Sequence, residues 1–311
     1  MISTLRDAAV RDLAWVISSP GLLDSAYPAY RQQLIDDHWC NTQLQAGSHW
    51  LSALDLQPQA LPAYIAARPT RRLGHYFETL IAYWLQHMPD TQLIASNLQV
   101  QSELRTLGEY DFLLRNAAGE ICHWEAAVKF YLQAEDIAEQ RAFIGPGTQD
   151  RLDLKMQRVF QHQLQLGHSL QGQQALPPGL TLNRAQAFIK GYLFYHATQP
   201  RNTAPIPGVS NAHLSGWWYR YGKEPLPQSA RDKRWIILPR LRWLSPACLP
   251  ADSEVLTQEA LEIALQRHFT QHNEALLLCE MQRVENTWQE CKRGFVVCAE
   301  WPKLGNALVM L

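Results

Sequence analysis

Residues 108–132, GEYDFLLRNAAGEICHWEAAVKFYL, are the stretch that decides the fold. Two runs rich in aromatic and aliphatic residues flank the short polar segment 116–119, a pattern typical of two strands joined by a tight turn. Ala117, Ala118 and Gly119 fit a three-residue hairpin loop, in which the last residue has a positive φ and is usually glycine. The sequence therefore predicts a β-hairpin with strands at about residues 109–115 and 120–132.

The loop also predicts the register of this hairpin. It places Asn116 opposite Glu120, and counting five residues outward on each strand places Asp111 opposite Glu125. Opposed residues of an antiparallel pair point to the same face, with Cβ atoms about 5 Å apart. Two carboxylates so placed repel each other, and a hard divalent cation such as Mg²⁺ would compensate them. The alternative is that each carboxylate pairs with an Arg or Lys on a neighbouring element.

Two further residues are candidates for the same site. Side chains alternate along a strand, so Lys129 shares a face with Glu125 and would hold an attacking water or offset charge on a phosphate. Glu78 lies one position past Phe77, at the border of the apolar stripe of a helix, and is a candidate third carboxylate. A solvated glutamate or a salt-bridge partner is the alternative for Glu78.

Working outward from the hairpin, the sequence predicts an α-β-β-β-α-β order over residues 71–195. An amphipathic pattern indicates a helix over 73–85. A strand-like pattern follows at 92–102, a helical pattern at 149–166 and a second strand-like pattern at 187–195. Residues 200–208, rich in proline, indicate a linker. We therefore expect an α/β (α+β) fold with a helical segment over 1–66, a core over 67–200 and an α+β part over 201–311.

Three blocks carry a family resemblance: RLGHYFE at 72–78, HWEAAVKFYL at 123–132 and DRL at 150–152. They resemble a bacterial family designated a domain of unknown function, DUF1853, over most of the chain. Residues 71–195 also resemble the PD-(D/E)XK nuclease-like superfamily. That resemblance implies a restriction-endonuclease-like core, a Mg²⁺ or Mn²⁺ site at Asp111 and Glu125, support from Glu78, and Lys129 as the catalytic lysine.

One departure from the superfamily pattern concerns the lysine. The pattern places it two residues after the glutamate, where this chain has Ala127, and Lys129 comes two residues later. Two residues displace a Cα by about 6–7 Å along a strand. Either a bulge or the long side chain recovers this distance, or the role of the lysine has moved to another residue, or turnover has been lost.

Two basic groups are candidates for nucleic-acid contact. Arg151 and Lys155 lie one helical turn apart and would grip phosphate together, although the pattern favours a solvated helix face. Residues 220–242 carry a local charge of +5, including Arg231, Lys233 and Arg234, with Trp and Tyr interleaved. Cations beside aromatic rings are typical of single-strand binding, whereas buried Trp with snorkelling Arg is the alternative.

Composition narrows the class of protein. A net charge of −1 excludes a protein that coats nucleic acid through bulk charge. The six cysteines form no CxxC pair, so neither a zinc ribbon nor a disulfide framework is indicated. No signal peptide and no apolar stretch of about 20 residues is present, so we expect a cytoplasmic protein with no membrane contact. Serine-hydrolase, P-loop and dinucleotide motifs are also absent.

The leading hypothesis from the sequence is a Mg²⁺-dependent phosphodiesterase that hydrolyses DNA or RNA. The alternative is a catalytically inactive nuclease-like module that binds nucleic acid or a protein partner. A third hypothesis gives the aromatic C-terminal part a role in assembly, with the core as its support.

Overall fold

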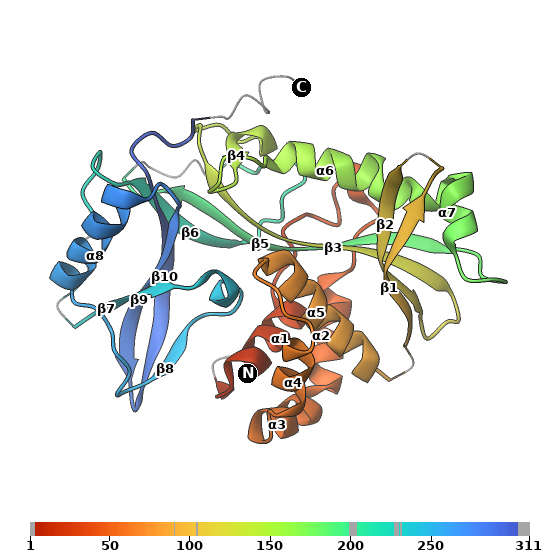
Figure 1. Cartoon of the computed structure of the whole chain (residues 1–311), viewed down its shortest axis with the longest axis horizontal. Coiled ribbons are helices and arrows are strands. Elements are labelled where there is room, and N and C mark those ends of the chain that lie inside the picture. Colours follow the sequence, from red (N-terminus) through yellow and green to blue (C-terminus); the bar gives the residue numbers. More distant parts are fainter. Residues whose placement is uncertain are drawn as a thin grey trace.

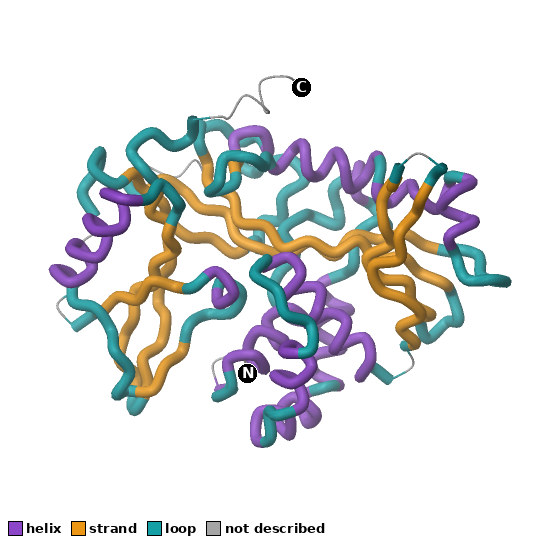
Figure 2. The backbone as a smooth tube through the Cα atoms, viewed as in Figure 1, coloured by secondary structure: helices purple, strands orange, loops and turns teal. Residues whose placement is uncertain are grey.

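The computed structural model describes residues 4–89, 91–103, 105–198, 204–226, 230 and 232–303. One long mixed β-sheet runs through the molecule, with helices on both of its faces (Figure 1). Figure 2 shows the same arrangement by secondary structure, with most of the helical chain gathered on one side of the sheet. The protein therefore belongs to the α+β class, as the sequence predicts.

The helices form an N-terminal group, a pair that follows the fourth strand, and one near the C-terminus. The α-helices are α1 (Ala8–Ser18), α2 (Asp37–Ala46), α3 (Ser48–Leu56), α4 (Ala60–Ala66), α5 (Leu73–His87), α6 (Leu152–Gln161), α7 (Leu170–Ala175) and α8 (Gln258–Gln271). Short 3₁₀ turns occupy Pro28–Tyr30, Gln140–Ala142, Gln163–His168 and Arg240–Arg242.

Among the described residues, the strands form a single sheet of ten. They are β1 (Gln92–Gln101), β2 (Thr106–Arg115), β3 (Ile121–Gln133), β4 (Phe143–Ile144), β5 (Arg184–His196), β6 (Leu214–Arg220), β7 (Arg234–Leu238), β8 (Cys248–Pro250), β9 (Leu276–Val284) and β10 (Thr287–Val297). Their order is β1-β2-β3-β5-β6-β10-β9-β7, with β4 beside β3 and β8 beside β10. The β1-β2-β3 and β10-β9-β7 runs are antiparallel, and β5 and β6 between them run parallel to β3 and β10.

The hairpin has the register that its loop predicts. Phe112 pairs with Trp124 and Arg115 with Ile121, and the backbone N–H of Asn116 donates to the carbonyl of Glu120 at 3.0 Å. Gly119 has a φ of +80°, the left-handed conformation that closes a three-residue loop without strain. The prediction of the register is therefore confirmed.

The two faces of the sheet bury different side chains. Helix α5 presents its apolar stripe to one face, where Phe77 stacks on Phe188 with ring centroids 6.0 Å apart and Phe188 stacks on Trp124. On the other face, Ala127 of β3 lies in a second core with Met156 of α6. Odd-numbered residues of the first part of β3, Glu125 among them, therefore face α6, because side chains alternate along a strand.

Some elements differ from the expectation. Strand β6 was not predicted, and the strand expected over 235–243 ends at Leu238 because Pro239 has no N–H for the ladder. The helix expected over 149–166 is the shorter α6 followed by a 3₁₀ turn. Strands β6–β10 extend the sheet begun by β1–β5, so the sheet continues across the boundary predicted near residue 200.

Within the described ranges, no helix is both long enough and apolar enough to cross a bilayer.

Candidate functional site

The end of the β2–β3 ladder positions a pair of buried carboxylates. The pairing of β2 with β3 extends from Arg115–Ile121 to Phe112–Trp124, and Asp111 and Glu125 follow that last pair. The Oδ2 atom of Asp111 accepts a hydrogen bond of 2.8 Å from the backbone N–H of Ala126. This contact ties the Asp111 side chain to β3 beside Glu125. Asp111 is 7% exposed and Glu125 is 2% exposed.

The two carboxyl groups titrate as a coupled pair. Burial, followed by the charge of Glu125, raises the pKa of Asp111 to about 9, although the Ala126 N–H acts in the opposite direction. Burial also raises the pKa of Glu125, against the attraction of Lys155 and a hydrogen bond from Asp111. Two acids in such contact hold one proton between them at neutral pH unless a cation displaces it.

The cation nearest to this pair is not the one that the sequence favours. Lys155 on α6 places its Nζ atom 3.4 Å from Oε1 of Glu125, and its side chain is 20% exposed. Lys129 instead forms an ion pair with Asp150, with 2.5 Å between its Nζ and Oδ2. Lys155 is thus the charged group that links Glu125 to the surface.

The neighbouring polar groups complete the surroundings of Glu125. Gln163, in the 3₁₀ turn after α6, donates from Nε2 to Oε2 of Glu125 at 3.4 Å. Its Oε1 atom is buried and has no hydrogen-bond partner in the part of the chain that the structure describes. Arg151, predicted to act with Lys155, pairs with Asp153 through two contacts of 2.7 and 3.0 Å.

Glu78 occupies a separate environment. Its Oε2 atom lies 3.2 Å from Nδ1 of His75 and 3.5 Å from Nδ2 of Asn97 on β1. It lines a cavity of about 300 Å³ together with Phe112, whose side chain packs in the core on the α5 side of the sheet. Glu78 contributes only a minor part of the rise in the pKa of Asp111.

The donor set at Asp111 and Glu125 fits a hard divalent cation in its chemistry. The two carboxylates are oxygen donors, which Mg²⁺ and Mn²⁺ prefer, and a like-charge pair gains from a bound cation. Within residues 4–303, leaving out the gaps in the described ranges, no three His, Cys, Asp or Glu side chains converge as a metal site. The set is therefore a two-carboxylate site whose shell solvent or substrate would complete.

The second basic group lies far along the sheet from this pair. Lys233 contacts Oε1 of Gln282 at 2.5 Å, and Arg234 donates to the carbonyl of Lys233 at 2.7 Å. Arg234 belongs to β7, at the opposite edge of the sheet from β1 (Figure 1). Arg231 lies outside the described residues.

Four of the aromatic residues interleaved with or next to these cations are core residues. Trp218, Tyr219 and Trp235 are 1–2% exposed, and Trp243 is 7% exposed. Rings so buried are not available to stack on bases, whereas Trp217 and Tyr221 are only partly buried. Residue spacing alone could not distinguish base stacking from core packing, because both place large aromatic residues next to arginine.

Sequence reasoning missed the arrangement around Glu125. Gln163 and the backbone N–H of Ala126 carry no motif, and the Arg151–Lys155 spacing suggested a shared phosphate grip. In the structure Lys155 turns to Glu125 and Arg151 turns to Asp153. The feature of the sequence that could have indicated the Lys155–Glu125 contact is the position of Lys155 near the start of the helix that returns across β3.

Comparison with known proteins places the chain in one family. Residues 11–297 match DUF1853, described as a domain of unknown function. No curated protein and no solved structure matches the chain.

Proposed function

The chain belongs to the DUF1853 family, and from that premise and the site geometry we propose that it is a Mg²⁺- or Mn²⁺-dependent phosphodiesterase acting on DNA or RNA. The observation that carries the proposal is the buried pair Asp111–Glu125, in which burial, followed by the charge of Glu125, raises the pKa of Asp111 to about 9. A like-charge pair costs a folded protein stability, and a bound cation would compensate it.

The strand arrangement around the pair supports the same proposal. Helix α5 precedes three antiparallel strands, α6 follows them, and β5 returns parallel to β3. This is the arrangement that a PD-(D/E)XK-like core implies, with the acidic residues on the second and third strands. Architecture alone does not assign an activity, so the proposal depends on the residues of the site.

Each residue has a role that its position allows. Asp111 and Glu125 would hold the cation, which would polarise the phosphoryl group and lower the pKa of bound water. Lys155, partly exposed beside Glu125, would offset charge that develops on the phosphate. We assign the lysine role to Lys155 in place of Lys129, because Asp150 already holds the ammonium group of Lys129. Glu78 would act at most through water.

A second candidate function is a nuclease-like module that binds nucleic acid or a protein partner without turnover. The specific observation in its favour is that Lys155 already neutralises part of the charge of Glu125, which is only 2% exposed. An ion pair that closes the site would replace the metal. The two functions differ in whether a divalent cation displaces the shared proton.

Calorimetric titration of Mg²⁺ and Mn²⁺ into wild-type protein and Glu125→Gln tests the cation site. We expect millimolar or tighter binding to wild type, with proton release, and no binding to the variant. Equal binding to both proteins would place the cation elsewhere, and no binding to either would favour the module without turnover.

Cleavage assays on single-stranded and duplex DNA and RNA then separate the two lysines. We expect Lys155→Met to lower the rate by about 10²-fold or more, the usual loss when a group that stabilises transition-state charge is removed. Lys129→Met is the matched control and should retain cleavage. The reverse pattern would return the lysine role to Lys129.

A further inference from the structure

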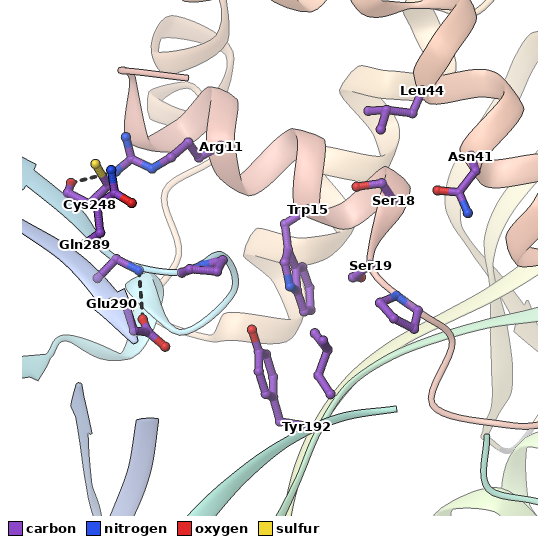
Figure 3. Close-up of a pocket in the computed structure, with 14 residues that line it drawn as sticks. Arg11, Trp15, Ser18, Ser19, Asn41, Leu44, Tyr192, Cys248, Gln289 and Glu290 are labelled. Atoms are coloured by element: carbon purple, nitrogen blue, oxygen red, sulfur yellow. Dashed lines mark hydrogen bonds between the residues drawn. The ribbon is translucent and has the colours of Figure 1, made fainter. Parts of the chain in front are cut away.

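A cavity of about 540 Å³ lies where the N-terminal helices meet the sheet, away from the carboxylate pair. Figure 3 shows its walls, formed by α1 and α2 on one side and by β5 and the strands β8 and β10 on the others. Small-molecule sites commonly have this size and lie at such junctions between structural layers. None of the residues assigned to the proposed phosphodiester chemistry lines it.

One face of α1 supplies the most distinctive residues of this cavity. Arg11 and Trp15 lie one turn apart on the same face, and the chain leaves the helix at Ser19. The ring of Trp15 is parallel to that of Tyr192 on β5, with 5.9 Å between centroids and 1° between planes. Leu44 of α2 adds an apolar wall. Trp15 and Tyr192 are 2% and 5% exposed, so they close this part of the cavity as an apolar wall rather than as open stacking faces.

Arg11 brings an unbalanced charge to the same cavity. Its side chain is 6% exposed, and within the described residues no carboxylate lies within ion-pair distance of it. Three of its five N–H donors reach backbone carbonyls, those of Leu5, Arg6 and Cys248. Its Nε–H is buried and has no acceptor among the described atoms. A buried guanidinium ordinarily has an anionic partner.

The acidic residue that lines this cavity does not supply that partner. Glu290 is held by Arg293, with contacts of 2.5 Å to Nε and 2.8 Å to Nη2. Glu290 also accepts hydrogen bonds from the backbone N–H of Ala247 and the thiol of Cys279. Among the described residues, no side chain therefore balances the charge of Arg11. The hydroxyl of Ser19 is a second buried polar group at the cavity wall without a partner in the described structure.

We propose that this cavity binds a small planar organic anion, an aromatic ring system that carries one carboxylate. The carboxylate pairs with the guanidinium of Arg11, and the ring fills the apolar part of the cavity against Leu44. Shape and charge select the ligand together, since the aromatic and aliphatic walls accept a flat apolar body and the unpaired cation requires an anionic group. This site is independent of the proposed metal site.

The test uses 2-naphthoate and its neutral isostere 2-naphthamide as probes, with binding to the full chain measured by calorimetry. We expect wild type to bind 2-naphthoate at least tenfold more tightly than 2-naphthamide, because a charge-assisted hydrogen bond contributes about this factor. Equal affinity for the two probes, or binding of neither at millimolar concentration, would overturn the proposal.

Two variants, Leu44→Trp and Arg11→Gln, locate the site, with Leu56→Trp as the control. Leu44→Trp should fill the cavity and lower the affinity for 2-naphthoate at least tenfold, whereas the same change at Leu56, an exposed residue on α3, should leave it unchanged. Arg11→Gln should remove the preference for the anion. If Arg11→Gln does not fold, the proposal is still tested by the comparison of the two probes on wild type and by the binding of 2-naphthoate to the two tryptophan variants. Unchanged 2-naphthoate binding to Leu44→Trp would exclude this cavity.

Discussion

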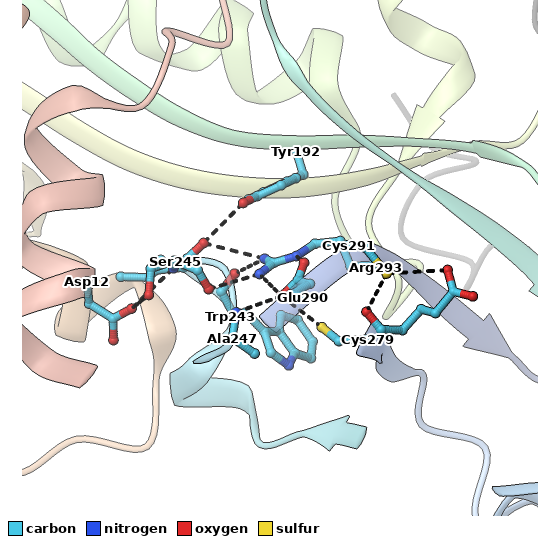
Figure 4. Close-up of polar contacts among 11 residues, drawn as sticks. Asp12, Tyr192, Trp243, Ser245, Ala247, Cys279, Glu290, Cys291 and Arg293 are labelled. Atoms are coloured by element: carbon cyan, nitrogen blue, oxygen red, sulfur yellow. Dashed lines mark hydrogen bonds and ion pairs between the residues drawn. The ribbon is translucent and has the colours of Figure 1, made fainter. Parts of the chain in front are cut away.

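Two buried charge clusters in this molecule are built in opposite ways. Asp111 and Glu125 bring two like charges together at the end of the β2–β3 ladder. Glu290 and Arg293, both on β10, bring opposite charges together in a network that joins this strand to the N-terminal helices (Figure 4). In the first cluster a shared proton and the nearby Lys155 offset the two carboxylates, whereas in the second the opposite charges offset each other.

The Arg293 cluster uses every donor of its guanidinium. Glu290 accepts from Nε and Nη2, and the remaining donors reach three backbone carbonyls, those of Trp243, Leu244 and Ser245. Burial opposes the positive charge, but Tyr192 and Glu290 outweigh it, so the pKa of Arg293 is raised above its ordinary value. The ring of Tyr192 also lies 4.5 Å from the guanidinium. These contacts indicate a structural role.

The difference shows how buried charge can be interpreted in a protein of this kind. A balanced, fully bonded pair is explained by the fold alone, because it repays part of the cost of removing its charges from water. A like-charge pair adds to that cost and requires another explanation, for which a bound cation is the simplest. Stability measurements on variants of both clusters test whether the fold alone explains the Glu290–Arg293 pair but not the Asp111–Glu125 pair.

The largest expected effect is on the balanced cluster. Glu290→Ala leaves Arg293 buried without its carboxylate, so we expect a loss of about 3–5 kcal/mol in the free energy of unfolding. Urea denaturation measures it, with Glu274→Ala at an exposed position as the control. A loss in the free energy of unfolding as small as that of Glu274→Ala would show that the Glu290–Arg293 pair does not have a structural role.

The opposite result is expected at the like-charge pair. Without divalent cations, Asp111→Asn should leave stability unchanged or increase it, because the amide removes the repulsion and its oxygen can still accept from the Ala126 N–H. Urea denaturation in the presence of a chelator measures this. A loss comparable to that of Glu290→Ala would mean that the Asp111 carboxylate is a structural group like Glu290.

The pH dependence of stability sharpens this contrast. The pKa of Asp111 is raised from 3.8 to about 9 on folding, so the folded protein binds one more proton than the unfolded chain between these values. The contribution of Asp111 is therefore fully present below about pH 4 and is lost as the pH rises towards 9. We expect wild type to lose stability over pH 5–8 by up to about 1.4 kcal/mol per pH unit relative to Asp111→Asn. Parallel profiles would contradict a raised pKa.

A divalent cation should reverse this loss. At a Mg²⁺ concentration one hundred times the dissociation constant at pH 6, we expect a gain of about 2.7 kcal/mol in wild type, and at the same concentration a larger gain at pH 8, because the cation displaces the shared proton. The thermal midpoint measures it, with Glu125→Gln as the variant that should show no gain. A gain in stability that does not depend on pH would mean that the cation binds elsewhere than at the Asp111–Glu125 pair.

The smallest expected effect distinguishes the two lysines in the absence of metal. Lys155→Met should weaken the compensation of Glu125 and lower the free energy of unfolding by about 1 kcal/mol or less, because the side chain is partly solvated. Lys129→Met should leave the pH profile of the carboxylate pair unchanged. A shift of that profile in Lys129→Met alone would show that Lys129, rather than Lys155, faces the pair.

The sequence by itself determined the local part of this structure. Helix α5, strands β1–β3, the loop at Gly119 and the register that aligns Asp111 with Glu125 all follow from periodicity and turn chemistry, which neighbouring residues encode. The family assignment over residues 11–297 agrees with the resemblance of short sequence blocks. Nothing distant in the chain was needed for these features.

Only the tertiary structure decided which charges meet. Lys129 shares a strand face with Glu125 but pairs with Asp150, while Lys155, thirty residues from Glu125, reaches its carboxylate. Glu78 lies apart with His75 and Asn97, and the tryptophans beside the basic C-terminal residues pack in the core. A strand pattern fixes the direction of a side chain, but its partner depends on the helix packed above it and on the length of the intervening chain. Those are long-range properties that residue spacing does not contain.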